Sequence, residues 1–243
     1  MSADTWPAKP VRLVVTQGTG SGSDVIGRLI AGKLGEQLQQ SVFVENRVGG
    51  SGIIGHQFVL GQPADGYTLL LSTTAPLAVV PAMNRNAKYR LADFTTVAPA
   101  IRSPFMVLVG TQPDSPQTLQ ALTRRLAGGG ANFSSSGTGT MTHLASELYL
   151  QAVDAKATHV PYKGSGQSLI DVMSGVVEYT FDSPATTLRH VKAGKLKAIA
   201  VTGEDRIPGE NIPTVGESGV PGFTYFSWIG LLAPAKTPRA IVE

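Results

Sequence analysis

Two stretches rich in glycine, serine and threonine carry the groups best suited to hold an anion. The first is Gly18-Thr19-Gly20-Ser21-Gly22-Ser23-Asp24, preceded by Gln17, and the second is Ser134-Ser135-Ser136-Gly137-Thr138-Gly139-Thr140. Glycine lets backbone N–H groups approach an oxyanion, hydroxyl groups add donors, and the start of a helix adds partial positive charge. Both stretches are predicted to bind a carboxylate or a phosphate. The alternative is that each is a tight turn whose hydroxyls only cap a helix.

Other polar residues fall where strands are predicted to end. Tyr162-Lys163-Gly164-Ser165 and Phe181-Asp182-Ser183 each follow an apolar run. Because open parallel sheets bind ligands at the carboxyl ends of their strands, both segments are candidates for a pocket wall. The alternatives are a solvated surface lysine and an ordinary turn aspartate. Of the four histidines, only His143 stands one turn into the helix after the second stretch, where it could orient that stretch or its ligand.

Motifs of common enzyme classes are missing from the sequence. The first glycine-rich stretch has Ser23 where the dinucleotide fingerprint needs its third glycine, and no G-x-S-x-G or H-E-x-x-H pattern occurs. The histidines do not have metal-ligand spacing. An enzyme that acts on a carboxylated or phosphorylated metabolite stays as an alternative, with Asp24, Asp182 and His143 as its candidate bases.

Composition and charge narrow the class of protein further. The chain has 20 Lys and Arg interleaved with 17 Asp and Glu, without the basic face of a nucleic-acid binder. It has no cysteine, which excludes disulfides, thiol catalysis and cysteine-ligated metals. No apolar run approaches the roughly 20 residues of a membrane helix, and no signal peptide precedes Trp6. Met1-Ser2-Ala3 therefore fits either the natural start of a cytosolic protein or a start that replaces a removed signal peptide.

The first anion-binding stretch is predicted to connect a strand to a helix. Val11–Val15 is β-branched and apolar, and Asp24 is placed as the N-cap of the helix that follows. The apolar residues of that helix recur at helical spacing: Val25, Ile26, Leu29, Ile30, Leu34 and Leu38.

Similar units are predicted along the rest of the chain. Apolar runs predict four further strands: Val42–Val44, Tyr67–Ser72, Met106–Gly110 and Lys197–Thr202. A helix is expected near Ile53–Leu60. Two more are expected to begin at Ser115-Pro116, ending at Gly128, and at Ser183-Pro184, ending at Gly194.

This alternation predicts an α/β protein with parallel-rich sheets flanked by helices. Proline, glycine and polar clusters at Ala98–Pro104 and Pro221–Thr224 suggest two crossings between lobes. We therefore expect residues 1–102 and 223–243 to form lobe 1 and residues 103–222 to form lobe 2.

The ordered motifs of this chain resemble the substrate-binding proteins of tripartite tricarboxylate transporters, also called Bug receptors. The matching segments are Lys9–Val15, Val44–Arg47, Pro63–Leu70, Ser136–Thr140 with His143-Leu144, Val160–Gly164, Ala193–Leu196, Ile212–Val215 with Glu217–Gly219, and Trp228–Pro234. They extend over essentially the whole chain.

The resemblance implies a two-lobed periplasmic-binding-protein-like fold of the Venus-flytrap kind, with a ligand cleft between the lobes. It implies a non-enzymatic, monomeric receptor without a cofactor or metal, which captures a small organic acid in the periplasm for membrane permease subunits. We then expect a removed signal peptide and a first lobe that is incomplete at its C-terminal end. A sensory or scaffold protein stays as another alternative, because it would bind its ligand in the same way and differ only in the partner to which it signals.

The resemblance also implies which residues bind the ligand. In lobe 1 they are Gln17, Gly18, Thr19, Gly20, Ser21, Gly22, Ser23, Asp24, Ser72, Thr73 and Thr74. In lobe 2 they are Ser135, Ser136, Gly137, Thr138, Gly139, Thr140, His143, Tyr162, Lys163 and Asp182. The family usually has proline at the positions of Thr16 and Thr19 and glycine at that of Ser21, so the first loop here is richer in hydroxyls.

Overall fold

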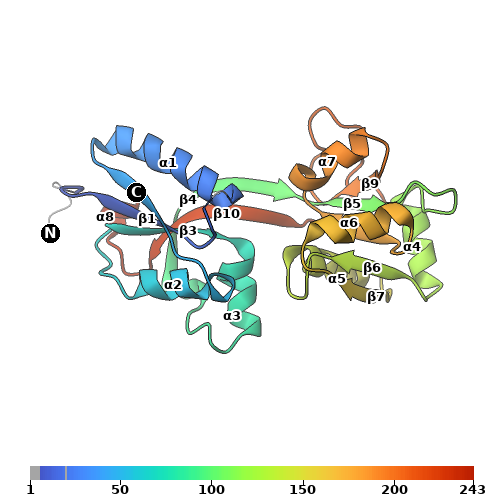
Figure 1. The fold of residues 1–243 in the computed structure, drawn as a ribbon, viewed down its shortest axis with the longest axis horizontal. Coiled ribbons are helices and arrows are strands. Elements are labelled where there is room, and N and C mark those ends of the chain that lie inside the picture. The colour runs from blue at the N-terminus through green and yellow to red at the C-terminus, as the bar shows by residue number, and fades with distance from the viewer. Residues whose placement is uncertain (1–5, 20) are drawn as a thin grey trace. The chain divides into compact units, whose positions relative to one another are not determined.

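The computed structural model describes residues 6–19 and 21–243, and the chain divides into two compact units. Unit 1 comprises Met1–Arg102 and Trp228–Glu243, and unit 2 comprises Ser103–Ser227. The chain leaves unit 1 once and returns once, so unit 2 is a continuous insertion. Each unit holds one five-stranded sheet with helices packed against it (Figure 1).

The strands and helices alternate along most of the chain. The strands of unit 1 are β1 (Val11–Val15), β2 (Val42–Asn46), β3 (Thr68–Thr73), β4 (Phe94–Pro104) and β10 (Phe226–Pro234). Those of unit 2 are β5 (Met106–Val109), β6 (Asn132–Ser135), β7 (Thr158–Pro161), β8 (Tyr179–Asp182) and β9 (Lys197–Val201). The helices of unit 1 are α1 (Gly22–Leu38), α2 (Ile53–Leu60), α3 (Val80–Met83) and α8 (Arg239–Val242). Those of unit 2 are α4 (Leu119–Ala127), α5 (Met141–Ala152), α6 (Ser165–Ser174) and α7 (Pro184–Lys192).

Each sheet contains three adjacent parallel strands. In unit 1 the order is β2-β1-β3-β10-β4, with β1 parallel to both β2 and β3, and β10 antiparallel to β3. In unit 2 the order is β7-β6-β8-β5-β9, with β6 parallel to β7 and β8, and β5 antiparallel to β8 and β9. The prediction of parallel-rich α/β sheets is confirmed, although both sheets are mixed.

Both faces of the unit 1 sheet are covered, which explains why β1 and β3 are almost wholly apolar. Leu13 and Val15 pack on one face with residues of α1, and Val14 packs on the other with Ile53 of α2. The α1 residues that pack are Ile26, Ile30 and Leu34. Val25 and Leu29, which share the predicted periodic pattern, are exposed instead. The buried side of α1 is therefore narrower than predicted.

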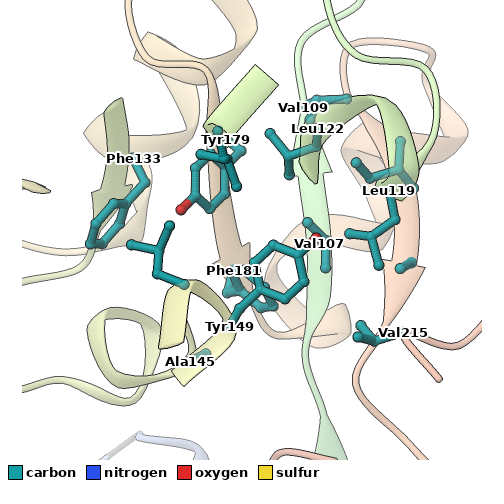
Figure 2. Packing of buried hydrophobic residues seen from close by; sticks show 14 of the residues in the cluster. Val107, Val109, Leu119, Leu122, Phe133, Ala145, Tyr149, Tyr179, Phe181 and Val215 are labelled. Atoms are coloured by element: carbon teal, nitrogen blue, oxygen red, sulfur yellow. The ribbon is translucent and has the colours of Figure 1, made fainter. Parts of the chain in front are cut away.

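The main core of unit 2 lies under α4 and α5. Leu119 and Leu122 of α4 pack with Tyr149 of α5 and with Tyr179 and Phe181 of β8 (Figure 2). The opposite face packs Met106 and Leu108 against Leu169 and Val172 of α6. Large buried aromatic side chains in this core fix the position of β8, which ends at the polar residue Asp182.

Two predicted helix starts are wrong. The N-cap of α1 is Ser21, whose hydroxyl accepts a hydrogen bond from the Asp24 amide (3.2 Å), so Asp24 lies inside the first turn. The helix expected at Ser115-Pro116 begins at Leu119, with Thr118 as its N-cap. Ser115 belongs to a preceding turn, because its amide and hydroxyl both donate to Gln112. The start of α7 after Ser183 is as predicted.

Among the residues that the structure describes, no helix combines the length and apolar character needed to cross a membrane.

Candidate functional site

The first glycine-rich stretch follows β1 and leads into α1, as the sequence predicts. Gly18, Thr19 and Gly22 are exposed, whereas Ser23 is buried. A methyl group added at Gly18 or Gly22 would meet no atom within 4 Å, so packing does not require glycine there. These positions leave the loop surface open to a ligand. Gly20, also predicted to bind, lies outside the described residues.

Asp24 anchors this loop through a polar network. It is buried, and its carboxylate accepts hydrogen bonds from Asn46 Nδ2 (2.9 Å) and Arg28 Nε (3.1 Å). Asn46 Nδ2 also donates to the Gln17 carbonyl (2.9 Å), and Thr19 Oγ1 donates to Asn46 Oδ1 (3.3 Å). The network fastens both ends of the loop to the end of β2. Asp24 therefore has a positioning role, since its oxygens already hold partners.

The Ser72-Thr73-Thr74 segment lies at the end of β3. Ser72 is buried and its Oγ lies 2.9 Å from Nε2 of His56, whose Nδ1 is 2.8 Å from the Gly52 carbonyl. Because the carbonyl can only accept, His56 carries its proton on Nδ1, and Ser72 donates to Nε2. Thr74 Oγ1 accepts from the Trp228 amide (3.0 Å). Thus Ser72 and Thr74 are engaged within unit 1, while Thr73 is only half-buried at the strand end.

The predicted site residues of unit 2 gather at one edge of its sheet. The parallel strands β7, β6 and β8 end there, and each is followed by the N-terminus of a helix, namely α6, α5 and α7. The Tyr162 amide donates to the Ser135 carbonyl, and the Gly164 amide to the Ser136 carbonyl, both at 3.1 Å. Three helix N-termini, each with a partial positive charge, therefore meet at this edge.

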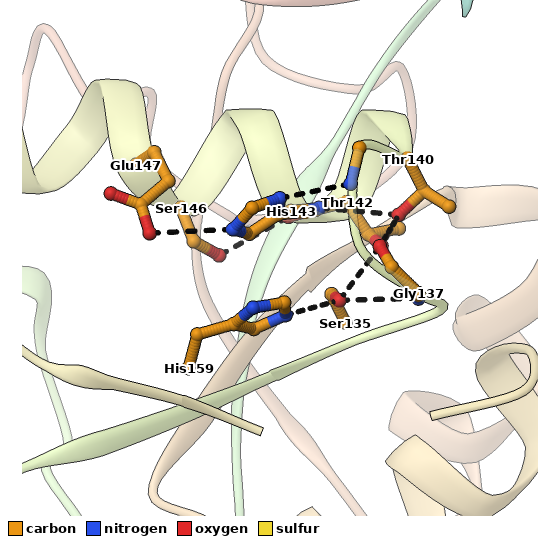
Figure 3. Close-up of polar contacts among 9 residues, drawn as sticks. Ser135, Gly137, Thr140, Thr142, His143, Ser146, Glu147 and His159 are labelled. Carbon is orange, nitrogen blue, oxygen red and sulfur yellow. Dashed lines mark hydrogen bonds and ion pairs between the residues drawn. The ribbon is translucent and has the colours of Figure 1, made fainter. Parts of the chain in front are cut away.

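Hydroxyl groups determine the conformation of the loop between β6 and α5. Thr142 Oγ1 accepts from the Ser136 amide (2.8 Å) and lies 2.9 Å from Ser136 Oγ. It also lies 3.0 Å from Thr140 Oγ1 (Figure 3). Thr140 caps α5 and also donates to the Gly137 carbonyl (2.7 Å). Gly137 has φ +139°, which favours glycine. Thr138 is exposed at the tip of this loop.

His143 forms a hydrogen bond with the loop that precedes its helix. Its Nδ1 accepts a hydrogen bond from the Gly139 amide (3.1 Å), so its proton is on Nε2, which faces Glu147 Oε1 at 3.4 Å (Figure 3). The ring thereby holds the last turn of the loop before α5.

Tyr162 and Lys163 differ in how firmly they are held. The Tyr162 hydroxyl donates to Asp171 Oδ2 (2.5 Å) and is turned toward α6. Lys163, in contrast, is exposed. Lys163 is thus an exposed cation beside this edge.

Asp182 is a buried carboxyl at the end of β8, 3% exposed. Its Oδ1 accepts a hydrogen bond from the Ser183 amide (2.6 Å), whereas Oδ2 has no hydrogen-bond partner among the described residues. Burial raises the pKa of this carboxyl, and the Ser183 amide and the nearby Ser165 hydroxyl, which lies outside hydrogen-bond geometry, oppose that rise. A buried, half-satisfied carboxylate costs stability and suggests a functional reason for its presence.

Asp182→Asn is expected to raise the free energy of unfolding at pH 7 by roughly 1 kcal/mol, because it removes a buried charge and keeps an oxygen for Ser183. The carboxyl binds its proton more tightly folded than unfolded, so the penalty is full above the raised pKa and disappears below the ordinary value of 3.8. The gain should therefore shrink as the pH falls toward 4, as measured by urea unfolding. Asp154→Asn, in an exposed turn, is the matched control. An equal gain in the free energy of unfolding at pH 7 and near pH 4 would contradict this explanation.

The structure also shows residues that contact the candidate loops and that sequence reasoning missed. They are Thr142 and His159 in unit 2 and Arg28 and Asn46 in unit 1. Of these four residues, only Asn46 could have been noticed in the sequence, because it lies in the Val44–Arg47 segment that supports the family resemblance. No group of three or more acidic, histidine or cysteine side chains gathers as a metal site within the described residues.

Comparison with known proteins gives a family match over most of the chain. The model of the family described as "Tripartite tricarboxylate transporter family receptor" matches residues 26–243. The Bordetella pertussis protein BugT is 34% identical, in an alignment that covers 100% of this chain and 76% of BugT.

Solved structures agree with that match. A protein of R. palustris, solved with adipate, has 34% identity and a TM-score of 0.75, covering 98% of this chain and 80% of the other. MatC from Rhodopseudomonas palustris, solved with bound malate, has 28% identity and a TM-score of 0.72, covering 98% and 82%. Both bound molecules are small dicarboxylates.

Proposed function

Because this chain belongs to the tripartite tricarboxylate transporter receptor family, we propose that it captures a small organic acid in the periplasm and presents it to membrane permease subunits. The single observation that carries the proposal is the polar edge of the unit 2 sheet, where three helix N-termini and the hydroxyl-rich loop meet. The dicarboxylates bound to two similar proteins support the ligand class.

We assign the binding of carboxylate groups to the two predicted loops, Gln17–Asp24 and Ser135–Thr140. Their donors are backbone amides and hydroxyls, which suit a carboxylate without a dedicated arginine. Thr73, Thr138 and Lys163 supply further free groups. Asp24, Ser72, Thr74 and His143 act by positioning, because their polar atoms are engaged within the protein.

The geometry argues against the enzymatic alternative. Ser135 Oγ lies 2.6 Å from His159 Nε2, the arrangement of an activated serine, but Ser135 is 0% exposed and no substrate can reach it. Asp24 is paired with Arg28, and both nitrogens of His143 face partners. Two of the three candidate bases, Asp24 and His143, are thus occupied by structural contacts, and the third, Asp182, is buried.

The function is tested by a thermal-shift screen of dicarboxylates, aromatic acids, amino acids and phosphorylated metabolites. A ligand at 100 times its Kd adds about 2.7 kcal/mol to the stability of the unit that binds it, which is roughly 5–10 °C in melting temperature. We expect a dose-dependent shift from one carboxylate class and no change in that compound by NMR. A shift only from phosphorylated compounds, or consumption of the ligand, would favour the enzyme.

The assignment of the second loop predicts that Ser136→Ala combined with Thr138→Val weakens binding of the best carboxylate by roughly 10–100-fold, because the net contribution of each of the two hydroxyl hydrogen bonds is about 0.5–1.5 kcal/mol. Calorimetric titration measures this loss. Thr158→Val, at the opposite end of β7, is the matched control. Unchanged affinity in the double variant would remove this loop from the site.

A further inference from the structure

Two histidines from different elements form a stacked pair beside the second loop. His143 belongs to α5 and His159 to β7, and their ring centroids are 3.9 Å apart with an interplanar angle of 14° (Figure 3). Phe133 of β6 stacks on the His159 ring at 4.9 Å. The parallel register of β6 and β7 makes Phe133 and His159 neighbours, and the pair is thereby fixed in the sheet.

His159 connects to the loop through one buried hydroxyl. Its Nε2 lies 2.6 Å from Ser135 Oγ, which accepts a hydrogen bond from the Gly137 amide (3.2 Å) and lies 3.1 Å from the Gly137 carbonyl. Gly137 and Gly139 both have the positive φ that favours glycine. His159 therefore acts, through Ser135, on a glycine whose backbone conformation other residues rarely adopt.

The pair holds the loop at two separate points. His159 reaches Gly137 through Ser135, and His143 binds the Gly139 amide directly. Thr138, the exposed residue of the loop, lies between these two anchors. The stack against His159 keeps the His143 ring in the plane from which Nδ1 meets that amide.

The surroundings of His159 favour the uncharged ring. Burial lowers its pKa, the neighbouring His143 lowers it further, and Glu147 opposes both. Those two residues, both from α5, are the titratable groups that act on it. The β6 and β8 side chains next to the stack, Phe133 and Tyr179, are aromatic.

We propose that His159 is a positioning residue of the carboxylate-binding loop, which it holds in its binding conformation through Ser135 and through the stack on His143. The inference rests on the proposed function, since it assigns to His159 the alignment of the donors that bind the ligand. His159 itself does not contact the ligand.

The test compares two substitutions that separate the hydrogen bond from the stack. His159→Phe keeps an aromatic ring between Phe133 and His143 but loses the bond to Ser135, whereas His159→Gln keeps a polar group near the position of Nε2. In calorimetric titration with adipate and malate, we expect His159→Phe to weaken binding about 5–10-fold, the equivalent of one hydrogen bond, and His159→Gln to recover affinity to within about 2-fold. Melting temperatures should differ by only a few degrees.

A control variant and a double variant test whether the loss of affinity comes from the contact between His159 and Ser135. His190→Phe, in the last turn of α7, should leave affinity unchanged. Ser135→Ala should weaken binding in the wild type but add little in the His159→Phe background, because both changes break the same contact. Equal affinity of His159→Phe and wild type would overturn the inference, as would equal losses for Phe and Gln.

The same variants distinguish failure of this inference from failure of the proposed function. If the wild-type protein binds neither acid nor any other carboxylate, the proposed function is wrong, and the positioning role is then judged without ligand. In ¹H–¹⁵N spectra, His159→Phe should shift the Gly137 and Gly139 amides, and His190→Phe should not. Unmoved Gly137 and Gly139 amides would contradict the positioning role.

Discussion

Thr142→Val is expected to weaken dicarboxylate binding by roughly 10-fold or more and to lower the free energy of unfolding by about 1–3 kcal/mol. Valine has nearly the shape of threonine, so the change removes one hydroxyl from a buried position. That hydroxyl accepts from the Ser136 amide and contacts the hydroxyls of Ser136 and Thr140. Without it, the amide is left unpaired and the loop loses its central anchor.

The matched control is Thr142→Ser, which keeps the hydroxyl and loses only a methyl group. Titration calorimetry and urea unfolding of both variants give the comparison. If Thr142→Val and Thr142→Ser had the same affinity, the hydroxyl network would not determine the binding conformation of the loop.

Asp24→Ala is expected to produce the second large effect, a loss of about 2–4 kcal/mol in the free energy of unfolding of unit 1. The buried carboxylate accepts from Asn46 and Arg28, and its removal leaves Asn46 without one partner near the end of β2. Arg28 is half-exposed and can be rehydrated, which keeps the loss below that of a fully buried pair. Affinity for the carboxylate should fall as well, because the Gln17–Ser23 loop loosens.

Glu36→Ala provides the control on the same helix, since Glu36 forms an exposed pair with Lys33. Chemical unfolding followed by the fluorescence of Trp6 and Trp228, both in unit 1, measures the change in that unit. A loss no larger than that of Glu36→Ala would mean that the network around Asp24 does not stabilise the loop.

Much of the fold follows from local pattern. The β1 and β3 strands were predictable because both faces of their sheet are covered and the sequence is correspondingly apolar. The error at α4 has a long-range cause, because the Gln112 side chain bonds to the Met173 carbonyl and holds Ser115 in a turn. The sequence around Ser115-Pro116 does not reveal that contact.

The candidate site shows the same division between local and distant contacts. The second loop and His143 could be predicted, because glycine, hydroxyl residues and a helix start lie within ten residues. His159 could not, since its contact with Ser135 depends on the pairing of β6 with β7, 24 residues apart. Thr142 lay inside the expected helix, where a threonine side chain gives no sign that it turns back to the loop.

The most direct test of the central claim, recognition of carboxylate groups, is calorimetric titration of the wild-type protein with its best acid and with the neutral amide of the same carbon skeleton. Donors at helix N-termini bind an anion far better than a neutral carbonyl, so the amide should bind at least about 100-fold more weakly. Equal affinity for acid and amide, or heat from phosphorylated compounds alone, would contradict a carboxylate receptor.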